Sequence, residues 1–475
     1  MSCTAGRLLS GTSRTDCWHG NAFPVPYNGG QDSGEENEDV EFEHMDTEDL
    51  DDPEALHEAG GVWTPLTEPI CRAPVHLFAR ANTEPGPKGR RNASYFKTAY
   101  DAFQSLYSDV ESLLVTQTNL YARQKRAACV LKRWLAFLVE VRRRPYDRHV
   151  WTSPRQRPWW PLRKWELQLW LGDWLQAGWR AHAPREDRLD KDAVASNPRM
   201  FLDWMTETRF EQIDRCIHAA DSAKAPKRGS ADYDPVYKVR ELVRKACTAW
   251  AKAYDPGAYV CVDETLLLFQ GRVAFKVRIP MKRAKVGIKL YVLTGVSPSY
   301  VLGFNIKTTR HNAAEHNGLF EGTVKVMELM EQAGLLDSFR TLVADNYYTS
   351  LEELRELRKR NTYTMGVIRQ SRVPPEAKFT PEEQRQPRGY SKTMVHDETG
   401  AMIGGWKDGR VVYMLSNATS SGQGKTAQRK VRGVGTIDVP CPHSFEVYNL
   451  KMWGIDGVRS RGVVCVRGQY PRLTA

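Results

Sequence analysis

Apolar residues recur at helical spacing in the N-terminal half of the chain. Between Arg123 and Pro145, one helical face collects residues 127, 130, 131, 134, 135 and 138. This pattern predicts an amphipathic helix that ends just before Pro145, with Trp134 in the core. The run KWELQLWLGDWLQAGW spaces four tryptophans almost helically, which predicts a buried helix rather than a ligand-binding cluster.

The stretch from Tyr259 to Lys289 has a different pattern. It reads as a strand with Asp263 inside an apolar run, followed by a basic hairpin. A carboxylate in such a strand costs free energy unless a cation or partner compensates it. Alternation places Asp263 and Glu264 on opposite faces, so only one of them can enter a site. A solvated acidic pair at the strand end is the alternative.

Two further aspartates have comparable settings. The apolar run TLVA ends on Asp345, and Ser350 with Glu353 has the spacing of a capping box that starts the next helix. Asp456 follows much later, in YNLKMWGID. Each has a structural alternative, because Asp-Asn and Asp-Gly pairs are frequent in turns. The three aspartates can form one site only if the fold brings them together.

A series of short blocks carries a family resemblance. VDE, GIK, ADNYYTS, MGVIRQSRVP, WKDGRVVYMLSN and YNLKMWGID follow one another, after the helical blocks FQSLYSDVESLLVTQTNLYARQ, ELQLWLGDWLQAGW and MTETRFEQIDRCIHAADS. From about Phe96 to about Arg459, this order resembles the piggyBac family of transposases and the proteins derived from them. No block is specific alone, and the specificity lies in their shared order.

The resemblance implies an α/β fold, with an RNase H-like mixed-sheet core, an α-helical N-terminal region and a β-rich insertion. The expected domains are an acidic disordered tail over residues 1–60, a helical dimerisation and DNA-binding region over 90–245 with a basic Trp-rich insertion at 123–164, the first part of the core over 255–370, the β-rich insertion over 371–440, the core segment with the third aspartate over 441–460, and an atypical tail over 461–475.

The resemblance also implies a chemistry. The family's three catalytic aspartates fall on Asp263, Asp345 and Asp456, which would bind two Mg²⁺ or Mn²⁺ ions and cleave and join DNA. Carboxylate oxygens are the hard ligands that Mg²⁺ prefers, and a pair of ions suits in-line phosphoryl transfer. The expected partners are transposon ends and TTAA-type target DNA, with a second copy of the chain as a possible homodimer.

The distribution of charge agrees with a nucleic-acid partner. The net charge is +11, but residues 1–60 hold 15 acidic and 2 basic residues, so the remaining chain carries +24. Such a surface attracts phosphate in a salt-sensitive way. The acidic segment 32–52 is expected to be disordered. It is either a solvated tail or a mimic of DNA that folds back on the basic part of the chain.

Two basic clusters are candidate DNA contacts. Arg142, Arg143 and Arg144 end the predicted amphipathic helix, beside a Trp-rich stretch whose indoles can stack on bases or pack together. Lys282, Arg283 and Lys289 lie along the hairpin after Asp263 and are predicted phosphate contacts. The alternative for the hairpin is a solvated edge strand protected by charge.

Other classes of protein find little support. The nine cysteines are scattered without a CxxC pair, which indicates reduced thiols inside a cell, and no zinc-binding pattern occurs. No apolar run reaches transmembrane length and no signal-peptide core is present. Basic clusters such as GPKGRR favour the nucleus.

The C-terminal region departs from the family pattern. Where the family has another acidic residue three positions after its third aspartate, this chain has Arg459, and we expect the long helical continuation and cysteine-rich tail to be missing. Two functions therefore stay open. One is an active metal-dependent transposase, and the other is a domesticated, catalytically inactive DNA-binding or chromatin protein.

Overall fold

The computed structural model describes residues 62–66, 85–88, 97–144, 148–150, 158–179, 205–269, 271–279, 285–308, 316–419, 421–431 and 435–452. Several sequence predictions lie outside these residues: the acidic tail, the C-terminal tail, Lys282, Arg283 and Asp456. In the described part, no helix is both long and apolar enough to cross a membrane.

A 45-residue helix, α2 (Ala99–Arg143), dominates the N-terminal region. It begins with a capping box between Thr98 and Asp101. It ends at Arg143, just before Pro145, as the sequence predicts. The core beside its N-terminal half is formed with α3 (Lys164–Trp179) and α5 (Glu207–Asp214). The prediction for Trp134 is wrong, because its side chain is 39% exposed along with the rest of that apolar face.

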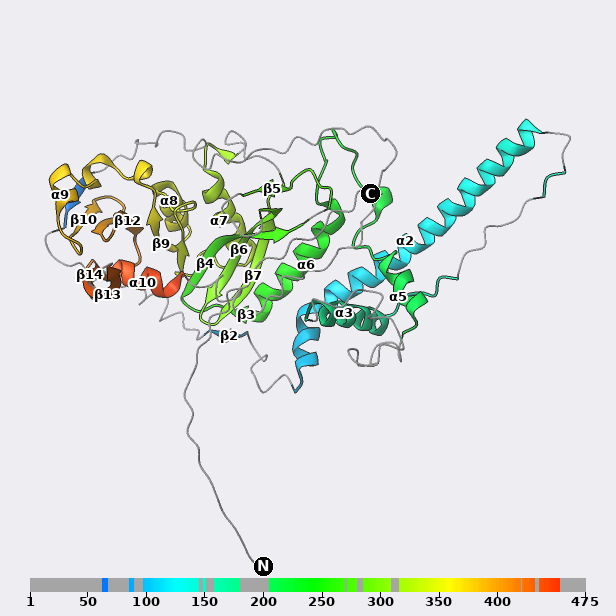
Figure 1. The fold of residues 1–475 in the computed structure, drawn as a ribbon, viewed down its shortest axis with the longest axis horizontal. Helices are drawn as coiled ribbons and strands as arrows, with labels where there is room; N and C mark the ends of the chain where they lie inside the picture. The colour runs from blue at the N-terminus through cyan, green and yellow to red at the C-terminus, as the bar shows by residue number, and fades with distance from the viewer. Residues whose placement is uncertain are drawn as a thin grey trace, which may run out of the picture. The chain divides into compact units, whose positions relative to one another are not determined.

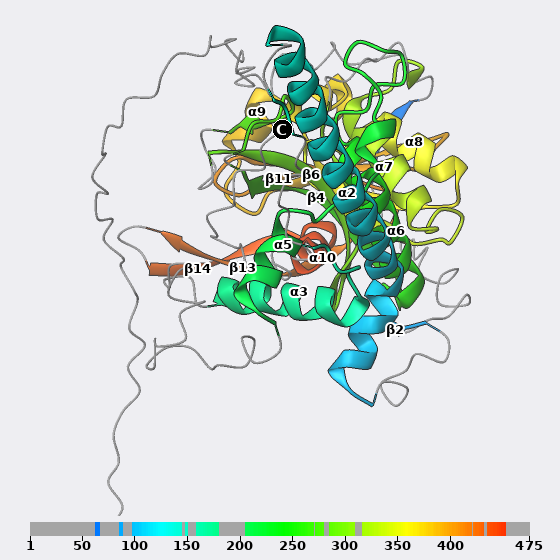
Figure 2. The same ribbon diagram turned by 90° about the vertical axis from the view of Figure 1, so that its right-hand side faces the viewer.

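Helix α6 (Tyr237–Ala253) connects this region to the sheet, since it contacts both α2 and strand β7 (Ser299–Ile306) (Figures 1 and 2). Strands β4 (Tyr259–Leu268), β6 (Val286–Val296) and β7 are antiparallel neighbours. On the other side of β4, strands β8 (Thr341–Ala344) and β9 (Tyr363–Ile368) pair in parallel. The resulting order β7-β6-β4-β8-β9 is the mixed α/β core that the sequence predicts.

The sheet continues beyond β9 with the strands of the predicted insertion. β12 (Val411–Ser416), β11 (Met402–Lys407) and β10 (Ser391–His396) follow as antiparallel neighbours. Strand β1 (Trp63–Pro65), from outside the insertion, pairs with β10 at the edge. With β5 (Val277–Arg278) beside β6, they complete a ten-stranded sheet. The sequence does not reveal this continuity, because strand pairing across such distances leaves no local pattern.

The other elements among the described residues lie outside this sheet. They are the pair β2 (Gly86–Pro87) and β3 (Tyr254–Asp255), the hairpin β13 (Gln423–Val431) and β14 (Gly435–Pro442), helices α7 (Glu321–Gln332), α8 (Leu351–Lys359), α9 (Pro381–Arg385) and α10 (His443–Lys451), and three 3₁₀ turns, η1 (Ser222–Lys224), η3 (Gln370–Arg372) and η4 (Pro375–Ala377).

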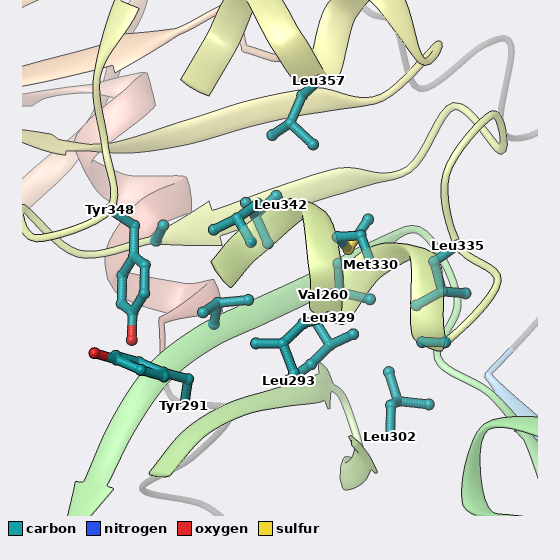
Figure 3. Close-up of a cluster of buried hydrophobic side chains, with 14 of the residues drawn as sticks. Val260, Tyr291, Leu293, Leu302, Leu329, Met330, Leu335, Leu342, Tyr348 and Leu357 are labelled. Carbon is teal, nitrogen blue, oxygen red and sulfur yellow. The ribbon is translucent and has the colours of Figure 1, made fainter. Parts of the chain in front are cut away.

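The main core lies on one face of β4, β6 and β8, where α7 covers the sheet (Figure 3). Val260, Leu293 and Leu342 from three neighbouring strands meet Leu329 and Met330 of α7 there. Because alternate residues of a strand point to opposite faces, this core fixes which residues of β4 and β8 point away from it.

Candidate active site

Asp263 and Asp345 are brought together by two parallel strands. Val262 of β4 pairs with Ala344 of β8, so the residue after each occupies the same level of the sheet. Val262 and Ala344 both belong to the core under α7. Alternation therefore directs Asp263 and Asp345 to the opposite face, side by side: Asp263 lies in the middle of β4, and Asp345 directly follows the end of β8.

The two carboxylates affect each other electrostatically. Burial and then the charge of Asp263 raise the pKa of Asp345 to about 6, and Glu264 adds to the rise. The backbone N–H of Tyr347 opposes the rise by donating to Oδ1 of Asp345 at 3.0 Å. Two carboxylates that raise a pKa in this way repel each other, and a cation or a proton between them relieves the repulsion.

Glu264 points to the other face, as alternation predicts. Its Oε2 lies 2.9 Å from Nζ of Lys289, and Lys289 is only 3% exposed. Lys289 was a predicted phosphate contact, and that role stays a prediction. In this structure its ammonium group pairs with Glu264 inside the protein rather than pointing into solvent.

Helix α10 packs beside the two aspartates. Met452, directly after the helix, places Sδ 3.6 Å from Sγ of Cys261, two residues before Asp263. The pKa of Tyr448 in α10 is raised by burial and by the charges of Asp345, Cys261 and Asp263. Asp456 itself lies outside the described residues. It follows Met452 by four residues, which span at most about 14 Å. The chain therefore continues toward Asp456 from a residue that contacts Cys261, two positions before Asp263.

The predicted DNA contact at the end of α2 has an open setting. Arg142, Arg143 and Arg144 are all exposed, and Nε of Arg144 lies 3.6 Å from Oε1 of Glu140. Lys282 and Arg283 lie outside the described residues, so of the hairpin cluster only Lys289 is placed.

Comparisons with known proteins agree with the fold and the site geometry described above. Residues 98–462 match the family described as Transposase IS4, which comprises piggyBac-type transposases. The chain belongs to the piggyBac-type transposase family. Its fold is similar to a solved piggyBac transposase in a synaptic complex with hairpin DNA, with a TM-score of 0.59 and 20% identity over 81% of this chain and 71% of that one. The resemblance drawn from the sequence is therefore confirmed.

The donor set of this transposase suits a hard divalent cation. Asp263 and Asp345 offer carboxylate oxygens from two rigid strands, and family membership implies dependence on a divalent metal. Within the described residues, no group of three or more His, Cys, Asp or Glu side chains is placed to hold a metal ion. The third predicted ligand, Asp456, lies outside the described residues, so the structure places two of the three predicted ligands.

The sequence did not single out the residues that surround the transposase's aspartates. Tyr347 and Tyr448 lie beside Asp263 and Asp345, and both appear in the blocks that carry the resemblance. Their roles depend on where α10 and the turn after β8 pack, and no local spacing encodes that.

Proposed function

We propose that this transposase cleaves and joins DNA by metal-dependent phosphoryl transfer at Asp263, Asp345 and Asp456. The observation that carries the proposal is the adjacency of Asp263, within β4, and Asp345, directly after the parallel strand β8. Burial and then the charge of Asp263 raise the pKa of Asp345. A pair of repelling carboxylates is unfavourable for stability alone and favourable for holding cations.

The residues of the chain divide the work. Asp263 and Asp345 would hold Mg²⁺ or Mn²⁺, with Asp456 as the third ligand. When bound, two such ions activate the attacking oxygen and stabilise the leaving oxygen of an in-line displacement. Tyr347 fixes one carboxylate oxygen through its N–H. Tyr448 of α10 lies close enough for burial and the charges of both aspartates to raise its pKa.

The proposed substrate is DNA, in the form of transposon ends and TTAA-type targets. A net charge of +24 outside residues 1–60 supports phosphate binding, with Arg142, Arg143, Arg144, Lys282 and Arg283 as predicted contacts. The related solved structure is described as a synaptic complex with hairpin DNA. A homodimer and a nuclear location complete the proposal. No finding favours the alternative of a catalytically inactive derivative.

The proposal is tested by Asp263→Asn and Asp345→Asn in the full chain. Each change removes one carboxylate charge at nearly constant volume, and we expect Mn²⁺-dependent DNA cleavage to be lost while DNA affinity without metal is kept. Asp337→Asn is the matched control, since Asp337 is a surface residue paired with Arg360. Cleavage by Asp263→Asn at the rate of the unchanged protein would overturn the assignment.

A further inference from the structure

Asp345 lies on a turn rather than within a strand. Strand β8 ends at Ala344 and α8 begins at Leu351. The turn is closed by Thr349, whose Oγ1 donates to the carbonyl oxygen of Asp345 at 2.8 Å, and by Tyr347, whose N–H donates to Oδ1 at 3.0 Å. The direction of the Asp345 carboxylate therefore depends on where Tyr347 is held.

Tyr347 is held from the opposite face of the sheet. Its hydroxyl donates to Oε2 of Glu321, the first residue of α7, at 2.7 Å. Glu321 also accepts from the hydroxyl of Tyr291 at 3.0 Å and lies 3.3 Å from Nζ of Lys307. Three donors on one carboxylate, only 14% exposed, make a fixed anchor for the ring.

The same group of residues reaches the second aspartate. Nζ of Lys289 lies 4.8 Å from the centroid of the Tyr347 ring and is paired with Glu264, the chain neighbour of Asp263. Two lysines and two glutamates thus balance in charge beneath the site. One network touches the chain next to both catalytic aspartates, from β4, β6, α7 and the turn after β8.

We propose that Tyr347 and Glu321 are positioning residues that set the direction of the Asp345 carboxylate for metal binding. This inference rests on the proposed function. The path runs from Glu321 through the Tyr347 hydroxyl to its own backbone N–H, and from there to Oδ1 of Asp345. Neither residue touches the reacting atoms.

The chain offers a matched pair of variants for the test. Tyr347→Phe and Tyr291→Phe each remove one hydroxyl from the same Glu321 carboxylate, and each leaves a ring near Lys289. Only Tyr347 belongs to the Asp345 turn. A role in stability alone would make the two variants alike, whereas a positioning role separates them.

The experiment is a Mn²⁺ titration of the full chain at a temperature where every variant is folded. Electron paramagnetic resonance measures the free Mn²⁺ at each step. Outer partners of metal ligands typically contribute ten- to hundredfold to affinity, so we expect Tyr347→Phe to weaken Mn²⁺ binding by about tenfold. Tyr291→Phe should keep the affinity of the unchanged protein. DNA affinity measured without metal should not change in either variant.

Glu321→Gln provides a second route to the same answer if Tyr347→Phe folds poorly. It keeps an acceptor for the tyrosines but removes the charge, so we expect it also to weaken Mn²⁺ binding. The double variant with Tyr347→Phe and Glu321→Gln should lose no more Mn²⁺ affinity than the more weakly binding of the two single variants. Unchanged Mn²⁺ affinity in Tyr347→Phe, or an equal loss in Tyr291→Phe, would overturn the inference alone. If the unchanged protein bound no more Mn²⁺ than the Asp263→Asn variant, both the inference and the proposed function would be overturned.

Discussion

Glu353, at the start of α8, is a buried acid outside the proposed site. The sequence predicted a capping box, and half of it forms: Oγ of Ser350 accepts from the Glu353 N–H at 3.0 Å. The carboxylate instead accepts from Oγ1 of Thr364 at 2.9 Å. Burial raises the pKa of Glu353 to about 8. The spacing of a capping box cannot show that a strand of the sheet will supply a competing donor.

This carboxyl makes stability depend on pH. Between about pH 5 and 8 the unfolded chain releases the Glu353 proton while the folded protein keeps it, so the free energy of unfolding should fall as pH rises, by up to about 1.4 kcal/mol per pH unit. Glu353→Gln should flatten that dependence. Urea unfolding at pH 5.5 and 8 measures it, with Glu356→Gln as a partly exposed control. An unchanged slope in Glu353→Gln would contradict the assignment.

Tyr348 presents the opposite situation, a buried polar group without a hydrogen-bond partner. Its side chain is 1% exposed and its hydroxyl has no acceptor among the described residues. The ring packs at right angles to Tyr291 (Figure 3) and also to Tyr347. Burial, followed by the charges of Glu264, Asp345 and Asp263, raises its pKa well above the usual value. The aromatic ring, rather than the hydroxyl, is what the core uses.

We therefore expect Tyr348→Phe to keep the free energy of unfolding or to raise it by about 1 kcal/mol, because no hydrogen bond is lost. Tyr413→Phe is the control, since the hydroxyl of Tyr413 accepts from the Phe379 N–H at 2.8 Å. Its loss should cost about 1 to 3 kcal/mol by leaving that N–H unpaired. Chemical denaturation compares the two, and a larger loss for Tyr348→Phe would be evidence against this account.

At the scale of elements, the sequence predicted which helices and strands form better than it predicted which elements pack against one another. The helical spacing located the end of α2 just before Pro145, and the apolar run TLVA located β8. The face of α2 that is buried was misjudged, since Val110, Thr118 and Ala122 are buried whereas Leu131 and Trp134 are exposed. Spacing reveals that one face is apolar, but burial also requires a neighbouring element, and that depends on tertiary packing.

The exposed face of α2 leads to a prediction about stability. Leu131 is 57% exposed, so Leu131→Gln should change the free energy of unfolding by no more than about 0.5 kcal/mol. Leu167 of α3 is fully buried, and Leu167→Ala should cost about 2 to 5 kcal/mol. Thermal and urea unfolding at low protein concentration test both. A large loss in Leu131→Gln would mean that this face is covered in solution.

At the scale of the whole molecule, the division of charge is the feature with the clearest consequence. The acidic first 60 residues oppose the +24 of the remaining chain. If they compete with DNA for the basic surface, deleting them should tighten binding to nonspecific DNA at low salt, and the difference should vanish at high salt. A variant of equal length with these acids replaced by Asn and Gln should behave like the deletion. Equal affinities at every salt concentration would reject competition.

The prediction of the site divides in a similar way. Asp263 and Asp345 were predicted because an acid within an apolar strand, or directly after one, is locally visible, and the family order supplied their grouping. Glu321 and Lys307 were not found, because their link to the site depends on the register of β6 and β7 and on the packing of α7. The sequence thus indicated the aspartates themselves, but not the residues on the opposite face of the sheet that contact the turn of Asp345.

The continuity of the sheet past β9 has a consequence for anyone wishing to shorten the protein. Strand β12 hydrogen-bonds to β9, which hydrogen-bonds to the strand that leads into Asp345. Excising residues 371–440 would not yield a smaller working protein, because β9 would become an exposed edge strand with unpaired N–H and C=O groups. Such an edge strand can pair with a strand of another molecule. The shortened chain should be recovered as aggregates, although the change lies one strand away from Asp345.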